Sequence, residues 1–167
     1  MFRPPARPPR PAAIYWLRHC QSVANAGGPV EIDTPLSADG AAAAANLEGS
    51  YDIVYVSPMR RARETLARSR ITAPIVVVEP LLREIIEDLS DMLAPGESPE
   101  GSAAAAARVA RLRDWLRGVA AHGGRILVVS HGDLFWRLSS HVLGGTRYGT
   151  LLANGERALV ENKWYRA

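Results

Sequence analysis

Apolar positions along this chain follow two alternating patterns. Short runs of β-branched and aromatic residues predict strands over residues 13–17, 53–57, 75–78 and 125–130. Longer segments without such runs predict helices over residues 37–47, 60–69, 99–121 and 133–143. Strands that alternate with helices form a mostly parallel sheet covered on both faces. We therefore expect a single-domain α/β fold with helices on both faces of the sheet.

Characteristic residues mark the ends of the predicted helices. Ser37 is expected to cap the first helix, and Pro99 is expected at the first position of the third. His122 is expected at the C-terminal end of the third helix. Gly144 and Gly145 should end the fourth helix.

The two ends of the chain depart from this alternation. Residues 1–12 are rich in Pro and Arg and predict a flexible tail, which leaves residues 13–167 as the folded domain. Residues 148–165 predict a terminal β-hairpin, because Asn154-Gly155 is a dipeptide typical of two-residue turns.

The composition is that of one globular domain. Of the 167 residues, 47% are apolar, which is enough to form a hydrophobic core. The single cysteine excludes an internal disulfide and fits a reducing compartment. No stretch reaches the roughly 18 to 20 apolar residues of a membrane span, and the N-terminus lacks the apolar core of a signal peptide. We therefore expect a cytoplasmic protein without a membrane partner.

The net charge of +3 resides in the Pro-rich tail. Arg3, Arg7 and Arg10 all lie there, and the body without them is formally neutral. The remaining arginines are interleaved with acids, which is typical of solvated helix faces. The sequence lacks the interleaving of basic and aromatic residues that binds single-stranded nucleic acid. Nucleic acid is therefore not an expected partner.

Two of the predicted strands end on a histidine. Arg18-His19 follows one apolar run, and His131-Gly132 follows another. Because open α/β sheets bind ligands at the carboxyl ends of their strands, these side chains should meet there. Two imidazoles and a guanidinium suit a phosphoryl group, since a guanidinium can donate two parallel hydrogen bonds to phosphate oxygens.

Four blocks of residues, in this order, carry a family resemblance. They are Arg18-His19-x-x-Ser22-x-x-Asn25, Ser57-Pro58-Met59-x-Arg61-Ala62-x-x-Thr65, Leu82-x-Glu84 and Ser130-His131-Gly132. The combination resembles the histidine phosphatase superfamily, the phosphoglycerate mutase-like proteins, from about Ile14 to Gly144. The first block departs from the family pattern at Cys20, where members usually have the smaller Gly.

The resemblance implies a histidine phosphatase fold and a role for each matched residue. His19 would be the nucleophile that takes the phosphoryl group as a phosphohistidine. Arg18 and Arg61 would clamp the phosphoryl oxygens, and His131 would complete that pocket. Glu84 would protonate the leaving oxygen.

The residues themselves leave alternatives open at two places. Ser22 and Asn25 fit auxiliary phosphate-binding positions of the first loop, but both residue types also stabilise turns through local hydrogen bonds. Glu87 and Asp88 compete with Glu84, because the residues that follow Glu84 lack the Trp-Glu-Gly pattern common in the family.

Arg61 and His19 each have a competing interpretation. Family spacing from Ser57 favours Arg61 over the three other arginines of the same predicted helix, which are Arg60, Arg63 and Arg68. His19-Cys20 also resembles the start of a cysteine phosphatase loop, in which His-Cys is followed by five residues and an essential Arg. Ala26 stands at that last position, so Cys20 is expected to be a small packed residue.

We therefore expect hydrolysis of a phosphomonoester through a phosphohistidine, without a cofactor or a metal ion. The four histidines are scattered, and neither His122 nor His141 has a carboxylate at ligand spacing. Related mutases carry a long insertion between the carboxylate and the second histidine, whereas positions 84 and 131 here are only 47 apart. A short segment over the site admits water, and access of water favours hydrolysis over mutase-type phosphoryl transfer.

A phosphate-binding module without turnover is the competing class of protein, and it would require that Glu84 cannot face His19. The partner is expected to be a small phosphorylated metabolite or a phosphohistidine protein. Sugar phosphates, nucleotide phosphates and ribazole phosphate all fit relatives of this size, and residues 87–99 match none of these distinctively. The sequence does not specify an oligomeric state.

Overall fold

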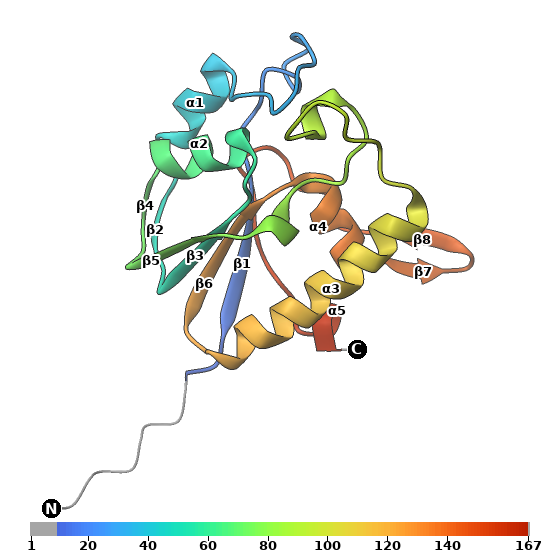
Figure 1. The fold of residues 1–167 in the computed structure, drawn as a ribbon. Coiled ribbons are helices and arrows are strands. Elements are labelled where there is room, and N and C mark those ends of the chain that lie inside the picture. Colours follow the sequence, from blue (N-terminus) through green and yellow to red (C-terminus); the bar gives the residue numbers. More distant parts are fainter. Residues whose placement is uncertain (1–9, 167) are drawn as a thin grey trace, which may run out of the picture.

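A five-stranded sheet forms the centre of the protein, as the computed structural model shows for residues 10–166 (Figure 1). In spatial order its strands are β5 (Ile75–Val78), β3 (Ile53–Val56), β6 (Arg125–Ser130), β1 (Ala13–Arg18) and β9 (Arg157–Leu159). The first four are parallel, and β9 runs antiparallel to β1. The four predicted strands and the mostly parallel α/β class are confirmed. Most of the predicted tail, residues 1–9, lies outside the described residues.

Helices cover both faces of this sheet. They are α1 (Ala38–Ala44), α2 (Arg60–Arg68), α3 (Ser102–Ala121), α4 (Gly132–Ser139) and α5 (Lys163–Arg166). Two 3₁₀ turns, η1 (Pro80–Leu82) and η2 (Leu89–Asp91), connect β5 to α3, and β2 (Glu48–Ser50) pairs with β4 (Arg70–Thr72). α1 packs against α2, whereas α3 packs against α4 and α5. Within residues 10–166, no helix combines the length and apolar character that a membrane crossing requires.

The inner strands β6 and β1 carry buried residues on both faces, as expected inside a parallel sheet. Ile126 and Val128 of β6 join Trp16 in the core beneath α3 and α4. Leu127 and Val129 point the other way, into the core shared with α2. Because burial on both sides fixes the register of β1 and β6, it also fixes which residues follow them at the carboxyl edge.

The fourth helix is shorter than predicted. α4 ends at Ser139, and β7 (His141–Leu143) pairs with β8 (Thr146–Tyr148) directly after it. Gly144 and Gly145 have φ angles of 58° and 80°, so they form the two-residue turn of this hairpin and do not end a helix. The prediction of a helix to residue 143 is wrong, because these glycines suit a hairpin turn as well as a helix end.

The third helix begins later than predicted. Its N-cap is Gly101, so Pro99 lies outside the helix. The chain ahead of α3 is tethered at Glu100, whose N–H donates to the Ile86 carbonyl at 2.9 Å and whose carboxylate pairs with Arg108. These tertiary contacts hold residues 99 and 100 away from a helical conformation.

The predicted terminal hairpin is also wrong. β9 pairs with β1, from the other end of the chain, and not with the strand that precedes it in the sequence. Asn154-Gly155 does form a turn, but the Gly155 N–H donates to the carbonyls of Arg18 and His19, both at 3.1 Å. This segment therefore provides hydrogen-bond partners for the edge of β1 and for the carbonyl groups at the end of that strand.

Two of the predicted helix ends are confirmed. Ser37 Oγ accepts the N–H of Gly40 at 3.0 Å, and His122 is the C-cap of α3. Gly40 also lies against the loop that follows β1, where an added Cβ would come within 1.9 Å of the Gln21 carbonyl oxygen. α1 is therefore seated directly on the loop that carries the first sequence block.

Gly40→Ala should destabilise the protein by about 1–3 kcal/mol, because the new methyl group overlaps a backbone carbonyl. Gly118 in α3 is the matched control, since an added Cβ there meets nothing within 4 Å. Gly118→Ala should stabilise the protein by about 0.5–1 kcal/mol, the usual advantage of alanine over glycine in a helix. Urea unfolding measures both changes, and a stabilised Gly40→Ala variant would contradict this packing of α1.

Candidate active site

The two predicted histidines lie side by side at the carboxyl ends of β1 and β6. The ring centroids of His19 and His131 are 5.1 Å apart, and His131 is fully buried. A cavity of about 220 Å³ opens beside His19. Its wall includes every predicted site residue except His131, namely Arg18, His19, Ser22, Asn25, Arg61 and Glu84. The structure thus brings together residues from four separate sequence blocks.

His19 is held as one tautomer of a neutral imidazole. Its Nδ1 lies 2.6 Å from the Cys20 carbonyl oxygen, which can only accept, so Nδ1 carries the proton. The lone pair of Nε2 accepts from Arg61 Nε at 3.1 Å. Burial, followed by the positive charges of Arg61 and Arg18, lowers the pKa of His19 well below its usual value of 6.5. The ring therefore presents an unprotonated Nε2 at neutral pH.

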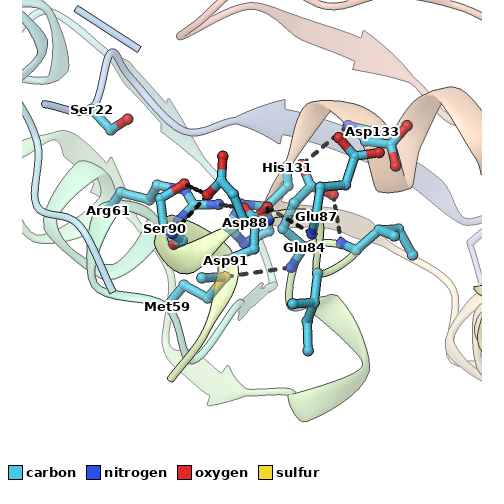
Figure 2. Close-up of polar contacts among 12 residues, drawn as sticks. Ser22, Met59, Arg61, Glu84, Glu87, Asp88, Ser90, Asp91, His131 and Asp133 are labelled. Atoms are coloured by element: carbon cyan, nitrogen blue, oxygen red, sulfur yellow. Dashed lines mark hydrogen bonds and ion pairs between the residues drawn. The ribbon is translucent and has the colours of Figure 1, made fainter. Parts of the chain in front are cut away.

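Arg61 lies in the first turn of α2 and is held by the segment around η2 (Figure 2). Besides its bond to His19, its Nη1 donates to the Ser90 carbonyl at 2.6 Å and its Nη2 to Asp91 Oδ1 at 2.9 Å. The side chains of Arg61 and Asp91 are 4% and 11% exposed, so this ion pair is buried. A guanidinium has further N–H donors beyond these three, which leaves some for a phosphoryl group.

Arg18 occupies the last position of β1 and lies across the start of α4. Its Nη1 donates to the Leu152 carbonyl at 2.6 Å, while its buried Nε has no hydrogen-bond partner within residues 10–166. An added Cβ at Gly132 would come within 2.9 Å of that Nε, so Arg18 packs directly on Gly132 and would have to shift if this residue were larger. Burial lowers the pKa of Arg18, although a guanidinium still remains charged.

His131 is neutral, and its buried Nδ1 has no hydrogen-bond partner within the described residues. The Ser57 hydroxyl oxygen accepts the N–H of Met59 at 3.2 Å and lies 2.8 Å from His131 Nε2. If Ser57 donates its hydroxyl proton to Nε2, the ring proton sits on Nδ1, which is buried and without a partner in the described part of the chain. Burial is the main cause that lowers the pKa of His131 well below 6.5. A buried donor without a partner is a common feature of functional sites.

Glu84 follows η1 and lies at the N-terminus of α4 (Figure 2). Its Oε1 accepts the N–H groups of Ile85 and Leu134, both at 2.9 Å, and its Oε2 accepts that of Asp133 at 3.1 Å. Burial raises the pKa of Glu84 to about 7, although these backbone donors and the charge of Arg61 act in the opposite direction. The carboxyl group can therefore both give and take a proton near neutral pH.

The competing residues differ from the matched ones in exposure. Among the arginines of α2, Arg61 is buried, whereas the exposed ones are Arg60, Arg63 and Arg68. Glu87 and Asp88 also line the cavity but are exposed, and Asp88 Oδ1 accepts from both the N–H and the hydroxyl of Ser90. Glu84 is thus the buried carboxyl of the three, and its burial raises its pKa.

The first loop and its cysteine have local structural contacts. Ser22 Oγ accepts the N–H of Asn25 at 3.1 Å, and Asn25 Oδ1 accepts the N–H of Ser22 at 3.2 Å. Both residues still line the cavity, so the turn they stabilise forms part of its wall. Cys20 is buried, and burial raises the pKa of its thiol, which disfavours a thiolate. Within residues 10–166, no three His, Cys, Asp or Glu side chains are arranged to hold a metal ion.

Sequence reasoning missed two residues of the site, Asp91 and Asn154. Asp91 pairs with Arg61, and it forms a capping box with Asp88 at η2. The Asp-x-x-Asp spacing could have indicated that turn, but its pairing with an arginine 30 positions away could not be read from the sequence. Asn154 Nδ2 donates to the His19 carbonyl and to Asn25 Oδ1, which ties the late turn to the first loop.

The titration of Glu84 should appear in the pH dependence of stability. A carboxyl whose pKa is about 7 in the folded state and about 4.5 in the unfolded chain costs stability as pH rises between these values, because the unfolded chain ionises first. The loss amounts to about 3 kcal/mol between pH 4.5 and 7. Urea unfolding at pH 5 and pH 8 should show this loss in the wild-type chain relative to Glu84→Gln, and parallel curves would contradict the raised pKa.

Solved structures of known proteins share this fold. The alpha-ribazole phosphatase of Shigella flexneri is 22% identical, with a TM-score of 0.60 over 90% of this chain and 100% of that one. The phosphoglycerate mutase of Thermus thermophilus is 24% identical, with a TM-score of 0.64 over 90% and 93%. A mycobacterial glucosyl-3-phosphoglycerate phosphatase is 25% identical, with a TM-score of 0.53 over 78% of each chain. Among curated proteins, no sequence match was found.

A sequence match to a family covers most of the chain. Residues 14–154 match the family described as the histidine phosphatase superfamily, branch 1. This span begins in β1 and ends at the Asn154 turn, so it contains every residue of the cavity wall. The chain therefore belongs to the histidine phosphatase superfamily.

Proposed function

We propose that the chain hydrolyses phosphomonoesters through a phosphohistidine on His19. The observation that carries this proposal is the state of that ring, which is neutral, held at Nδ1 by the Cys20 carbonyl, and directs the lone pair of Nε2 toward Arg61. A nucleophile requires such a lone pair in a fixed orientation. Membership of the superfamily and the phosphatases among the similar structures support the same class of reaction.

In the first step, the lone pair of His19 Nε2 attacks phosphorus, and the bond between phosphorus and the ester oxygen breaks. The departing oxygen takes the proton of Glu84, which a pKa of about 7 leaves partly protonated at neutral pH. The proton on Nδ1 stays in place, so the phosphorylated ring is an imidazolium that the Cys20 carbonyl stabilises.

In the second step, water attacks the phosphorus of the phosphohistidine. The Glu84 carboxylate, left ionised by the first step, takes the proton of that water. The bond between phosphorus and Nε2 breaks, its electron pair returns to His19, and inorganic phosphate leaves. One carboxyl with a pKa near 7 thus serves as the acid and then as the base.

Three residues near His19 offer nitrogen donors to a transferred phosphoryl group, namely Arg18, Arg61 and His131. Arg18 Nε and His131 Nδ1 have no partner within the described residues, so phosphoryl oxygens would satisfy them. Arg61 Nε donates to His19 Nε2 in this structure, and it must turn to a phosphoryl oxygen before that nitrogen can attack. These donors would stabilise the charge that develops on the transferred group.

Hydrolysis is favoured over mutase-type transfer by the cover of the cavity. Between Glu84 and α3 this cover is a short segment with the single turn η2, and its residues Glu87 and Asp88 are exposed beside the cavity. A mutase must keep water from the phosphohistidine, whereas a phosphatase must admit it. A phosphate-binding module without turnover would need no proton donor, yet Glu84 and His19 line the same cavity.

The phosphoenzyme should be detectable directly. Rapid quench of the wild-type chain with a reactive phosphomonoester should trap a phosphate that is labile to acid and stable to base, and inorganic phosphate should follow. His19→Ala should lose both signals. His141→Ala is the matched control, because His141 is exposed on β7, and it should retain both. Turnover by His19→Ala, or an acid-stable adduct, would refute the mechanism.

The proton donor should be revealed by its dependence on the leaving group. Glu84→Gln should slow hydrolysis of an alkyl phosphate by roughly 10²–10⁴, because a poor leaving group needs the proton, and should affect p-nitrophenyl phosphate far less. Glu87→Gln and Asp88→Asn should slow the two substrates alike and only slightly. If instead one of these two variants shows the leaving-group dependence, that residue is the acid and Glu84 is not.

A further inference from the structure

A second cavity, of about 400 Å³, adjoins the candidate active site. The two cavities share Arg18 and Asp133 as part of their walls. The other residues around the second cavity are Gly132, Trp136, Leu151 and Leu152. The proposed phosphoryl chemistry makes no use of the tryptophan or of the two leucines.

The floor of this cavity is one face of α4. Gly132 and Asp133 lie four and three positions before Trp136, so both are its neighbours on the helix surface. The opposite side comes from the segment after β8, which packs closely on the tryptophan. An added Cβ at Gly149 would lie 2.8 Å from two atoms of the Trp136 indole and 2.4 Å from its carbonyl oxygen. The chain at Gly149, two residues before Leu151, therefore lies directly against the indole.

The proton donor places the leaving oxygen beside this cavity. Glu84 Oε2 accepts the N–H of Asp133, and Asp133 belongs to both walls. An ester oxygen that receives the proton of Glu84 must therefore lie at the first turn of α4. The carbon substituent of that oxygen then has the second cavity next to it.

The charges at the cavity are already compensated on the side away from the phosphate. Asp133 Oδ2 accepts from Arg137 Nε at 2.8 Å, so its carboxylate is paired. Arg18 lines both cavities, and its Nη1 already donates to the Leu152 carbonyl at 2.6 Å. The rest of the cavity wall includes the indole of Trp136 and the side chain of Leu151, and Leu151 is 79% exposed. A flat apolar group placed there would remove this apolar surface from water and could stack on the indole.

We infer that the second cavity binds an aromatic ring of the leaving alcohol, so that the substrate class is a phosphomonoester with a planar apolar group near its ester oxygen. This inference rests on the proposed function, because it takes the ester oxygen to be protonated by Glu84. Trp136 and Leu151 are then specificity-determining residues, and they act on the leaving alcohol and not on the phosphoryl group.

The first test compares three alkyl esters of similar leaving-group acidity, namely 2-(naphthalen-2-yl)ethyl, 2-cyclohexylethyl and propyl phosphate. The wild-type chain should prefer the naphthyl ester over the propyl ester by at least about 10-fold in kcat/KM, a typical effect of a well-filled apolar pocket. The cyclohexyl ester should fall at least about 3-fold below the naphthyl ester, because it cannot stack. Equal values for the naphthyl ester and either comparison ester would overturn the inference.

Leu151→Ala is the sharpest variant, because so exposed a side chain contributes little to the fold. It should lower the ratio of naphthyl to propyl kcat/KM by about 5-fold. Leu143→Ala is the matched control, since Leu143 is 69% exposed and lies outside the cavity wall, and it should leave the ratio unchanged. Trp136→Ala should lower the ratio further, and Trp136→Phe should restore part of it. Equal ratios in the Leu151 and Leu143 variants would contradict the proposed site.

A binding measurement separates this inference from the proposed function. Calorimetry with 2-(naphthalen-2-yl)ethylphosphonate and propylphosphonate needs no turnover. Tighter binding of the naphthyl compound, which Leu151→Ala weakens, would support the aromatic site even if no ester is hydrolysed, in which case the proposed function alone fails. Equal dissociation constants would overturn the aromatic site, even if all esters are hydrolysed and the proposed function stands.

Discussion

The hydrogen bond between His19 Nδ1 and the carbonyl of Cys20 is the interaction on which the site depends. It fixes the tautomer, and so decides that Nε2 carries the lone pair. The backbone that supplies it is itself held, because Gly155 donates to the carbonyls of Arg18 and His19, and the Cys20 N–H donates to Thr65. A surface turn that is distant in sequence thus stabilises the loop that orients the nucleophile.

Burial shifts the pKa values of the proposed nucleophile and the proposed acid in opposite directions, and the proposed mechanism needs both shifts. It lowers the pKa of His19 and raises that of Glu84, because in each case it disfavours the charged form. For Glu84, the N–H of Ile85, the charge of Arg61 and the N–H of Asp133 act against burial, and the resulting pKa is about 7. The first turn of α4, which follows His131, therefore also holds the proposed acid.

The features that depend on local pattern could be predicted from the sequence, and those that depend on tertiary contact could not. The apolar runs located the four parallel strands, and the polar residues after them marked the edge where the cavity lies. The predicted helix end at Gly144-Gly145 is a hairpin turn in the structure, and the sequence could not distinguish the two because glycine pairs suit both. Asp91, Trp136 and Leu151 gave no signal, since their meaning comes from partners far along the chain.

The two arginines of the site are not equivalent, although both carry a guanidinium group suited to phosphoryl oxygens. Arg61 is buried, and its charge is already balanced by Asp91, so a phosphoryl group must share or replace an existing ion pair. Arg18 makes no ion pair with the described residues and keeps a buried donor without a partner. In the proposed function, a bound dianion would therefore gain most of its new charge interaction from Arg18. Because Arg18 lines both cavities, this one side chain would join the proposed phosphate site to the proposed site for the alcohol.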